Sequence, residues 1–162
     1  MTETHRINSQ LKRAYQGEAW HGPSLRELLD GVTAEQAVTR PIHNAHSIWE
    51  IVLHVIAWEG IAKRRLEGES VMEVPDEMNF PPVTDTSEQA WQTTLQSLNR
   101  SNQELRDAIK RIDDSQLDEI VPGMIYSNYA MLHGVIQHDL YHAGQIALLK
   151  KAFIRNERRP PR

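Results

Sequence analysis

Apolar residues recur at helical spacing along most of the chain, and four long stretches carry this pattern. Within residues 3–18, a thin stripe at steps of four is formed by Ile7, Leu11 and Tyr15. Side chains four residues apart lie on one face of a helix, so the stripe predicts a first amphipathic helix. A short helix is predicted next, capped by Ser24 and ending before Gly31.

The second long stretch opens with a capping signal. Ser47 and Glu50 have the spacing of a capping box, in which each side chain accepts a hydrogen bond from the backbone N–H of the other residue. The run that follows, to about Leu66 or Glu67, is apolar around most of its circumference, which is typical of a well-buried helix. The β-branched residues within Ile51–Ile56 would also suit a strand. The whole apolar segment is about 19 residues long, which favours a helix.

The third and fourth long helices lie in the second half of the chain. Asp85 or Thr86 is predicted to cap the third helix, whose apolar positions keep to one face for about two dozen residues. The fourth helix is predicted to begin near Ser127 and to run to about Phe153 or Ile154. The connection between them contains a proline and a glycine side by side, which favours a loop.

An acidic, proline-rich segment, Gly68–Thr84, separates the second and third long helices. Its length allows a reach of roughly 55 Å, far more than a tight hairpin needs. The segment is therefore predicted to cross from one end of a bundle to the other, and as a long loop it is a candidate lid over a site. Four helices, one crossover and no convincing pair of strands predict an all-α, antiparallel four-helix bundle, a single domain over residues 1–162.

Composition narrows the class of protein. The 162 residues carry a net charge of −4, which argues against nucleic acid or an anionic membrane as a partner. Without cysteine the chain forms neither a disulfide nor a thiolate metal site. No apolar run is long enough to span a membrane, and Met1–Gln10 lacks the apolar core of a signal peptide, so a cytoplasmic protein is predicted. The basic C-terminal end suits a helix terminus, and Pro160–Pro161 predict a frayed tail.

Three histidines lie where two of these helices are predicted to face each other. His138 and His142 are four residues apart in an apolar run, and His54 lies alone in the run of the second long helix. Imidazoles one turn apart can chelate a divalent ion, and a third from a facing helix makes a three-His site with an open coordination position. The alternative is that these are hydrogen-bonded core histidines. Buried imidazoles without partners cost about 1–3 kcal/mol each, which a metal would offset.

The remaining histidines are expected to point elsewhere. His133 is about 140° from His138 around the helix axis. His5 and His21 lie in polar surroundings. His43 and His46 precede the second long helix and could line its mouth, but surface positions are favoured for them. The H-x-x-x-H spacing also invites comparison with the H-E-x-x-H motif of metalloproteases, but Asp139 replaces the glutamate that serves there as general base, which argues against a protease.

Neighbours of the three histidines can be placed by helical angle. Glu50 and Trp58 are each one turn from His54, and Gln145 flanks the His pair of the fourth helix, as does Tyr141. A metal-bound imidazole usually donates its second N–H to a carboxylate or a carbonyl. Glu50 or Asp139 is the candidate for that role, and Trp58 is expected chiefly to pack in the core.

Four segments resemble the DinB-like (damage-inducible) superfamily, most of all its YfiT-type branch. They are Pro23–Leu29, Val32–Ala37, His46–His54 with Trp58–Glu59, and His138–Gln145. The most specific element is one His on the second long helix combined with H-x-x-x-H-x-G-Q on the fourth. The resemblance extends from about Pro23 to Lys150 and places the family's metal triad on His54, His138 and His142. It implies a four-helix bundle, often dimeric, that binds Zn or Ni with water completing the shell.

The resemblance and the predicted site lead to two hypotheses about function. In the first, the protein is a metal-dependent enzyme for a small-molecule substrate, because the similar proteins include thiol-dependent transferases, thiol-dependent isomerases and proposed hydrolases. Transfer of a low-molecular-weight thiol is preferred on that resemblance alone. In the second, the ion only braces the bundle of a non-catalytic, stress-related protein. A homodimer is also predicted, since Trp20 or Trp91 is left over once a single bundle is packed.

Overall fold

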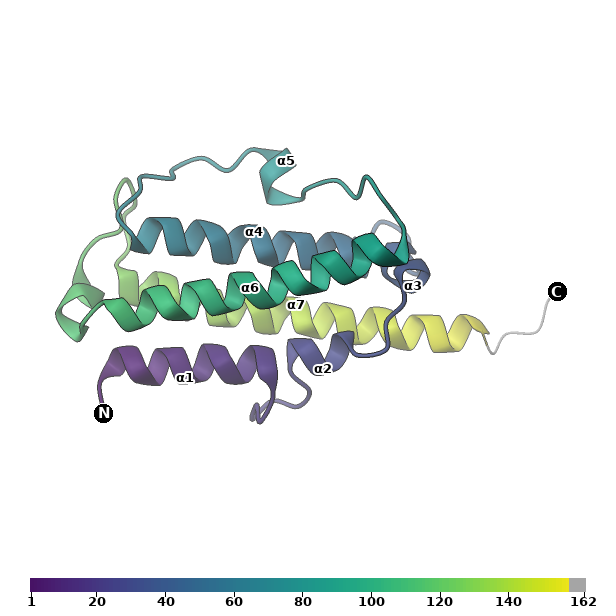
Figure 1. The fold of residues 1–162 in the computed structure, drawn as a ribbon, viewed down its shortest axis with the longest axis horizontal. Helices are drawn as coiled ribbons and strands as arrows, with labels where there is room; N and C mark the ends of the chain where they lie inside the picture. Colours follow the sequence, from purple (N-terminus) through teal and green to yellow (C-terminus); the bar gives the residue numbers. More distant parts are fainter. Residues whose placement is uncertain (158–162) are drawn as a thin grey trace.

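The fold is all-helical, as predicted, and four long helices lie side by side in a bundle (Figure 1). The computed structural model describes residues 1–157, the last four by their backbone alone. The helices are α1 (Glu3–Gln16), α2 (Leu25–Leu29), α3 (Ala34–Val38), α4 (Ile48–Leu66), α5 (Asp76–Asn79), α6 (Glu88–Arg111), the 3-10 helix η1 (Asp114–Asp118) and α7 (Asn128–Glu157). The predicted tail at Pro160–Pro161 lies outside the described residues.

The direction of the helices follows from the long crossover. α1 and α7 run one way along the bundle, and α4 and α6 run the other way (Figure 1). Two successive long helices, α4 and α6, are parallel because the segment Gly68–Thr84 returns the chain to the end at which α4 began. The predicted crossover is therefore confirmed, and the short helix α5 lies within it. None of the helices that the structure describes combines the length and apolar character needed to cross a membrane.

Local capping side chains fix where most helices begin. The predicted capping box of α4 is present: the Ser47 hydroxyl accepts from the Glu50 N–H at 3.2 Å, and the Glu50 carboxylate accepts from the Ser47 N–H at 2.8 Å. Ser24 caps α2 in the same way, as predicted. Helix α3 was not predicted, although Thr33 and Gln36 form a third capping box at its start.

The predicted cap of α6 is wrong by one or two residues. Ser87, and neither Asp85 nor Thr86, caps this helix, because its hydroxyl accepts from the Ala90 N–H at 3.2 Å. The Asp85 carboxylate instead accepts from the N–H of Ser87 at 2.8 Å and so holds the turn that precedes the helix.

The core has two apolar halves. The half near α2 and α3 includes Val52 of α4, Leu98 of α6 and Ile146 of α7. The other half combines the opposite ends of the same three helices with Ile7 and Leu11 of α1. It includes Ala62, Leu66, Leu105, Leu132 and Ile136. Between the halves lies a polar layer, which we define as His54 and Glu59 of α4, Asn102 of α6, and His138, Asp139 and His142 of α7.

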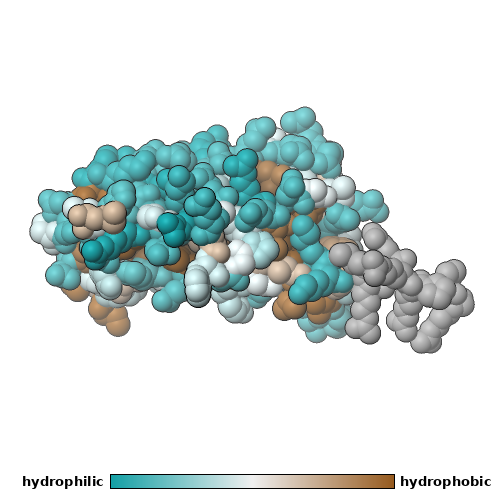
Figure 2. Space-filling view, turned by 90° about the horizontal axis from the view of Figure 1, so that it is seen from below, coloured by the Kyte–Doolittle hydropathy of each residue, from teal (hydrophilic) through white to brown (hydrophobic). Residues whose placement is uncertain are grey.

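Two tryptophans bear on the predicted dimer. Trp91 is fully buried and its indole N–H donates to the Val32 carbonyl at 2.7 Å, so Trp91 is not left over by the packing of the bundle. Trp20, between α1 and α2, is fully exposed. The face on the α1 and α2 side is largely hydrophilic, with its apolar residues in small separate patches (Figure 2).

Candidate metal centre

The structure brings together the three histidines that the sequence singles out. His54 comes from α4, and His138 and His142 come from successive turns of α7. The Nε2 atom of His138 lies 2.9 Å from that of His54 and 3.1 Å from that of His142. One potential ligand atom from each ring lies within 4.8 Å of those of the other two. The cluster could hold a metal ion, and that it does so stays a prediction.

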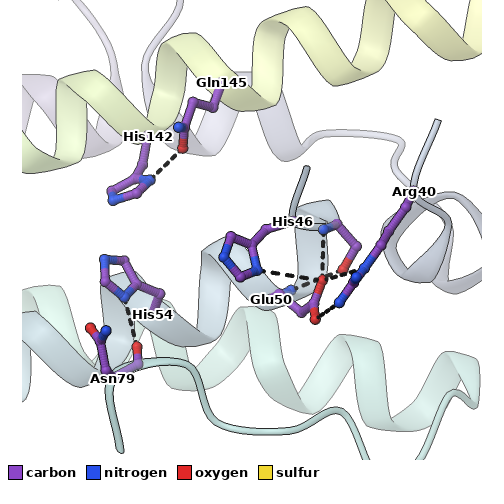
Figure 3. Close-up of polar contacts among 8 residues, drawn as sticks. Arg40, His46, Glu50, His54, Asn79, His142 and Gln145 are labelled. Atoms are coloured by element: carbon purple, nitrogen blue, oxygen red, sulfur yellow. Dashed lines mark hydrogen bonds and ion pairs between the residues drawn. The ribbon is translucent and has the colours of Figure 1, made fainter. Parts of the chain in front are cut away.

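The second ring nitrogen of two of these histidines has a fixed partner (Figure 3). The Nδ1 atom of His54 lies 2.6 Å from the backbone carbonyl oxygen of Asn79, and Nδ1 of His142 lies 2.7 Å from the side-chain oxygen of Gln145. Both oxygens can only accept, so each Nδ1 carries the hydrogen in the neutral ring. The Nε2 atoms of His54 and His142 therefore present lone pairs, which is the tautomer of a metal ligand.

Converging lone pairs need a positive charge or a proton between them. A hydrogen on Nε2 of His138 can form a linear hydrogen bond with Nε2 of His54 or with Nε2 of His142, but not with both. A single ion between the three rings accepts a lone pair from each of the three Nε2 atoms. Nitrogen ligands about 2.1 Å from one ion lie about 3–3.4 Å apart, close to the observed spacing. The donor set thus fits a divalent ion of the kind that imidazole nitrogens bind.

Burial favours the neutral form that a ligand needs. It lowers the pKa of His138 and of His142 to about 4, and it also lowers the pKa of His54. All three imidazoles are therefore uncharged at neutral pH and do not have to lose a proton to bind an ion.

The crossover segment forms a roof over His54. Besides its carbonyl, Asn79 supplies a side-chain oxygen that accepts from the Trp58 indole N–H at 2.9 Å. The Phe80 ring is stacked between two imidazoles, with its centroid 4.1 Å from that of His54 and 3.9 Å from that of His46. His46, predicted at the surface, is half-exposed but has one ring face covered. Neither Asn79 nor Phe80 was predicted at the site.

Glu50 does not orient a histidine of the cluster, contrary to one of the expectations. Its carboxylate accepts from the Ser47 N–H and from Arg40, and it lies 3.9 Å from Nδ1 of His46 (Figure 3). Burial works to raise the pKa of Glu50, but the hydrogen bonds from Arg40 and Ser47 outweigh it and lower that pKa. Glu50 is therefore an ionised helix cap at the edge of the site.

Asp139 does not orient His138 either. Its nearer oxygen is 3.6 Å from Nδ1 of His138, which is too long for a hydrogen bond. Asp139 and Glu59 are both fully buried, and only Glu59 has a partner among the described residues, the side-chain N–H of Asn102 at 2.8 Å. Burial raises the pKa of Asp139 to about 8, and burial followed by the charge of Asp139 raises that of Glu59. A fully buried carboxyl group that bonds none of the three histidines does not have the placement of a protease's general base, which agrees with the argument against a protease.

A cavity of about 390 Å³ borders the cluster on the side of His138. Its walls are mostly apolar and include Trp58, Met131 and Val135, with Arg65 and Tyr126 as the polar exceptions. Trp58 thus lines the cavity and donates a hydrogen bond to Asn79 of the crossover segment, whereas only packing in the core was predicted for it.

The histidines predicted to lie elsewhere do so. His133 packs against Tyr129, with ring centroids 4.4 Å apart, and is not part of the cluster. His5, His21 and His43 are exposed.

The part of the chain that matches a known protein family includes all three histidines of the cluster. A family model described as the DinB superfamily matches residues 19–146. A conserved protein from Enterococcus faecalis has a similar structure, with a TM-score of 0.73 over 95% of this chain and 98% of that chain. The two sequences are 17% identical, so this likeness shows the fold alone. No curated protein matches the chain.

Proposed function

Because the chain belongs to the DinB superfamily, we propose that its three-His cluster binds a divalent metal ion, Zn or Ni, and serves a metal-dependent enzyme acting on a small molecule. The observation that carries the proposal is the convergence of the Nε2 atoms of His54, His138 and His142 beside a cavity. Three protein ligands leave a coordination position for water or substrate, which distinguishes catalytic from structural sites.

The residues around the cluster have definite tasks in this proposal. His54, His138 and His142 hold the ion, while the Asn79 carbonyl and the Gln145 side chain fix the rings in the ligand tautomer. When bound, the ion would lower the pKa of a water or a thiol so that either is a nucleophile near neutral pH. Thiol transfer is preferred to hydrolysis because the resemblance described above includes thiol-dependent transferases.

The alternative is that the ion only braces the bundle. It would join α4 to α7 in the middle of the polar layer, between the two apolar halves of the core. The cavity beside His138 favours the enzyme, because a brace needs no adjoining space of about 390 Å³.

Metal analysis tests the first part of the proposal. The purified protein should contain or take up one Zn or Ni per chain, and His54→Ala, His138→Ala and His142→Ala should each lose it. His133→Ala is the matched control, since it removes an imidazole from the same helix but outside the cluster. A wild-type protein that refuses both ions would reduce the site to a group of core histidines.

Activity tests the second part. The metal-loaded protein is incubated with several low-molecular-weight thiols and an electrophile, and formation of the thioether is followed. The rate should exceed that of the triple His→Ala variant for at least one thiol. Stoichiometric metal with no activity toward any thiol or hydrolysable ester would favour the brace.

A further inference from the structure

Arg65 is a buried cation in the wall of the cavity beside His138. Its side chain is 6% exposed. The guanidinium donates through Nε and Nη2 to the Val71 carbonyl at 3.0 and 2.6 Å, and through Nη1 to the Tyr126 hydroxyl at 3.0 Å. Among the described residues, no carboxylate oxygen lies within 4.0 Å of it. Its charge is therefore met by neutral partners alone.

This arrangement is unusual for a buried charge. A desolvated cation is normally paired with an anion, because the energy lost with its hydration shell is otherwise not recovered. A guanidinium has five N–H groups, of which Val71 and Tyr126 accept three, so two remain for another acceptor. Arg65 can thus receive an anion without giving up the bonds that hold it.

The cavity between Arg65 and the cluster suits an apolar group. Trp58 and Met131 line it, and the guanidinium carbon lies 5.8 Å from the centre of the Trp58 ring. Arg65 follows Trp58 by two turns, a rise of about 10 Å along α4, so the cavity extends from the level of the cluster toward that of Arg65. A molecule in it would meet His138 on one side, apolar walls along its length and a cation on the other.

We propose that the cavity selects substrates with an apolar body and a terminal carboxylate, which Arg65 binds while the body lies against Trp58. This inference rests on the proposed function and names the class of substrate for the same site. It makes Arg65 a specificity-determining residue. It also accounts for the polar corner that Arg65 and Tyr126 form in a cavity whose walls are mostly apolar.

Calorimetric titration of the full chain with a matched pair of probes tests this. 4-Phenylbutyrate has an apolar body and a carboxylate, and 4-phenylbutan-1-ol has the same body without the charge. The Zn-loaded protein should bind the carboxylate at least tenfold more tightly than the alcohol. Arg65→Met should abolish that preference while leaving the alcohol affinity within about twofold, and Arg65→Lys should retain part of it.

Two glycines of α7 supply variants that do not depend on replacing a buried arginine. A Cβ atom added at Gly134 or at Gly144 would meet nothing within 4 Å, and of the two glycines only Gly134 lines the cavity. Leucine also favours a helix more than glycine does, so neither change should unfold α7. Gly134→Leu should weaken binding of both probes at least tenfold, and Gly144→Leu should leave both unchanged.

The outcomes separate this inference from the proposed function. Equal binding of the two probes, no binding of either at millimolar concentration, or undiminished binding by Gly134→Leu would each overturn it. Repeating the titration after chelation keeps the two claims apart. A protein that takes up no metal but still prefers the carboxylate would overturn the proposed metal centre and keep the cavity assignment.

Discussion

At the scale of single residues, the second nitrogen of each imidazole decides what the cluster can do. The His142 ring is held by Gln145, three residues further along the same helix, and this neighbour follows from helical geometry. The His54 ring is held by a backbone carbonyl, that of Asn79, and a carbonyl leaves no signature in the sequence. Helical geometry therefore places Gln145 beside the pair, but it does not identify which neighbour bonds a ring: the predicted partners Glu50 and Asp139 also lie on these helices and bond none of the three imidazoles.

Gln145→Ala is expected to lower metal affinity by about 10- to 100-fold, because the His142 ring loses the acceptor that fixes its tautomer and orientation. Competition against a chromogenic chelator measures the change. Gln137→Ala, an exposed glutamine of the same helix, is the control and should bind as the wild type does. Equal affinities for all three proteins would show that Gln145 does not support the ligand.

Glu50→Gln is expected to lower the free energy of unfolding at pH 7 by about 0.5–1 kcal/mol, the range of a partly exposed ion pair. The folded state lowers the pKa of Glu50 below 4.5. A carboxylate of this kind stabilises the fold above its unfolded pKa, and the contribution is lost as the pH falls through the lowered value.

Urea denaturation at several pH values measures this difference. The gap between wild type and Glu50→Gln should therefore shrink as the pH falls below about 4.5. Glu73→Gln, which replaces an exposed carboxylate of the crossover, should leave stability unchanged at every pH. A gap that widens in acid would mean that Glu50 is not stabilised in its ionised form.

At the scale of helices and loops, the ends of elements are predictable where their signals are local. The Ser47 and Glu50 capping box identifies the start of α4 because both partners lie within one turn. The cap of α6 is misplaced because Asp85, Thr86 and Ser87 all carry suitable side chains, and only the fold decides among them. The position of the crossover over His54 is not predictable, since it depends on where a long loop comes to rest.

Phe80→Ala should loosen the crossover over the cluster, because the loop loses a ring stacked between His46 and His54. Stacking worth about 0.5–1.5 kcal/mol corresponds to roughly 2- to 12-fold faster release of metal to excess chelator. Stopped-flow measurement of the release tests this. Met78→Ala, which replaces an exposed residue of the short helix α5 just before Phe80, should release metal at the wild-type rate.

At the scale of the whole molecule, the bundle and the meeting of its three histidines were predictable, and the rest of the polar layer was not. Apolar periodicity identifies which face of each helix is buried, but it does not say that buried polar residues of α4, α6 and α7 meet at one level. Glu59, Asn102 and Asp139 look like isolated interruptions in the sequence. Only the packing of the three helices turns them, with the histidines, into one layer.

An ion in that layer should stabilise the entire fold. A ligand that binds only the folded state stabilises it. When the free ligand concentration is 100-fold above the Kd, the free energy of unfolding rises by about 2.7 kcal/mol. Chemical denaturation with saturating Zn and with excess chelator should therefore differ by about this amount, and the His142→Ala variant should show no difference. If the free energy of unfolding of the wild type is the same with Zn and with chelator, no ion is bound between α4 and α7.

The homodimer stays a proposal, which now depends on Trp20 because Trp91 is buried. Sedimentation at micromolar concentration should show a species twice the 18.6 kDa chain, and Trp20→Ser should shift it toward the monomer. A monomer at every concentration would remove the prediction, and the small separate apolar patches on the α1 and α2 side would then need no partner (Figure 2).

The distance along the chain between the ligands has a consequence for biosynthesis. His54 is made 84 residues before His138, so a nascent chain emerging from the ribosome carries a lone imidazole on α4 until the last long helix is translated and docks. No fragment that ends before α7 has the three-His cluster. If the cluster binds metal, only chains in which α7 has packed against α4 hold an ion. The fraction of chains with bound metal would then measure the fraction that has folded completely.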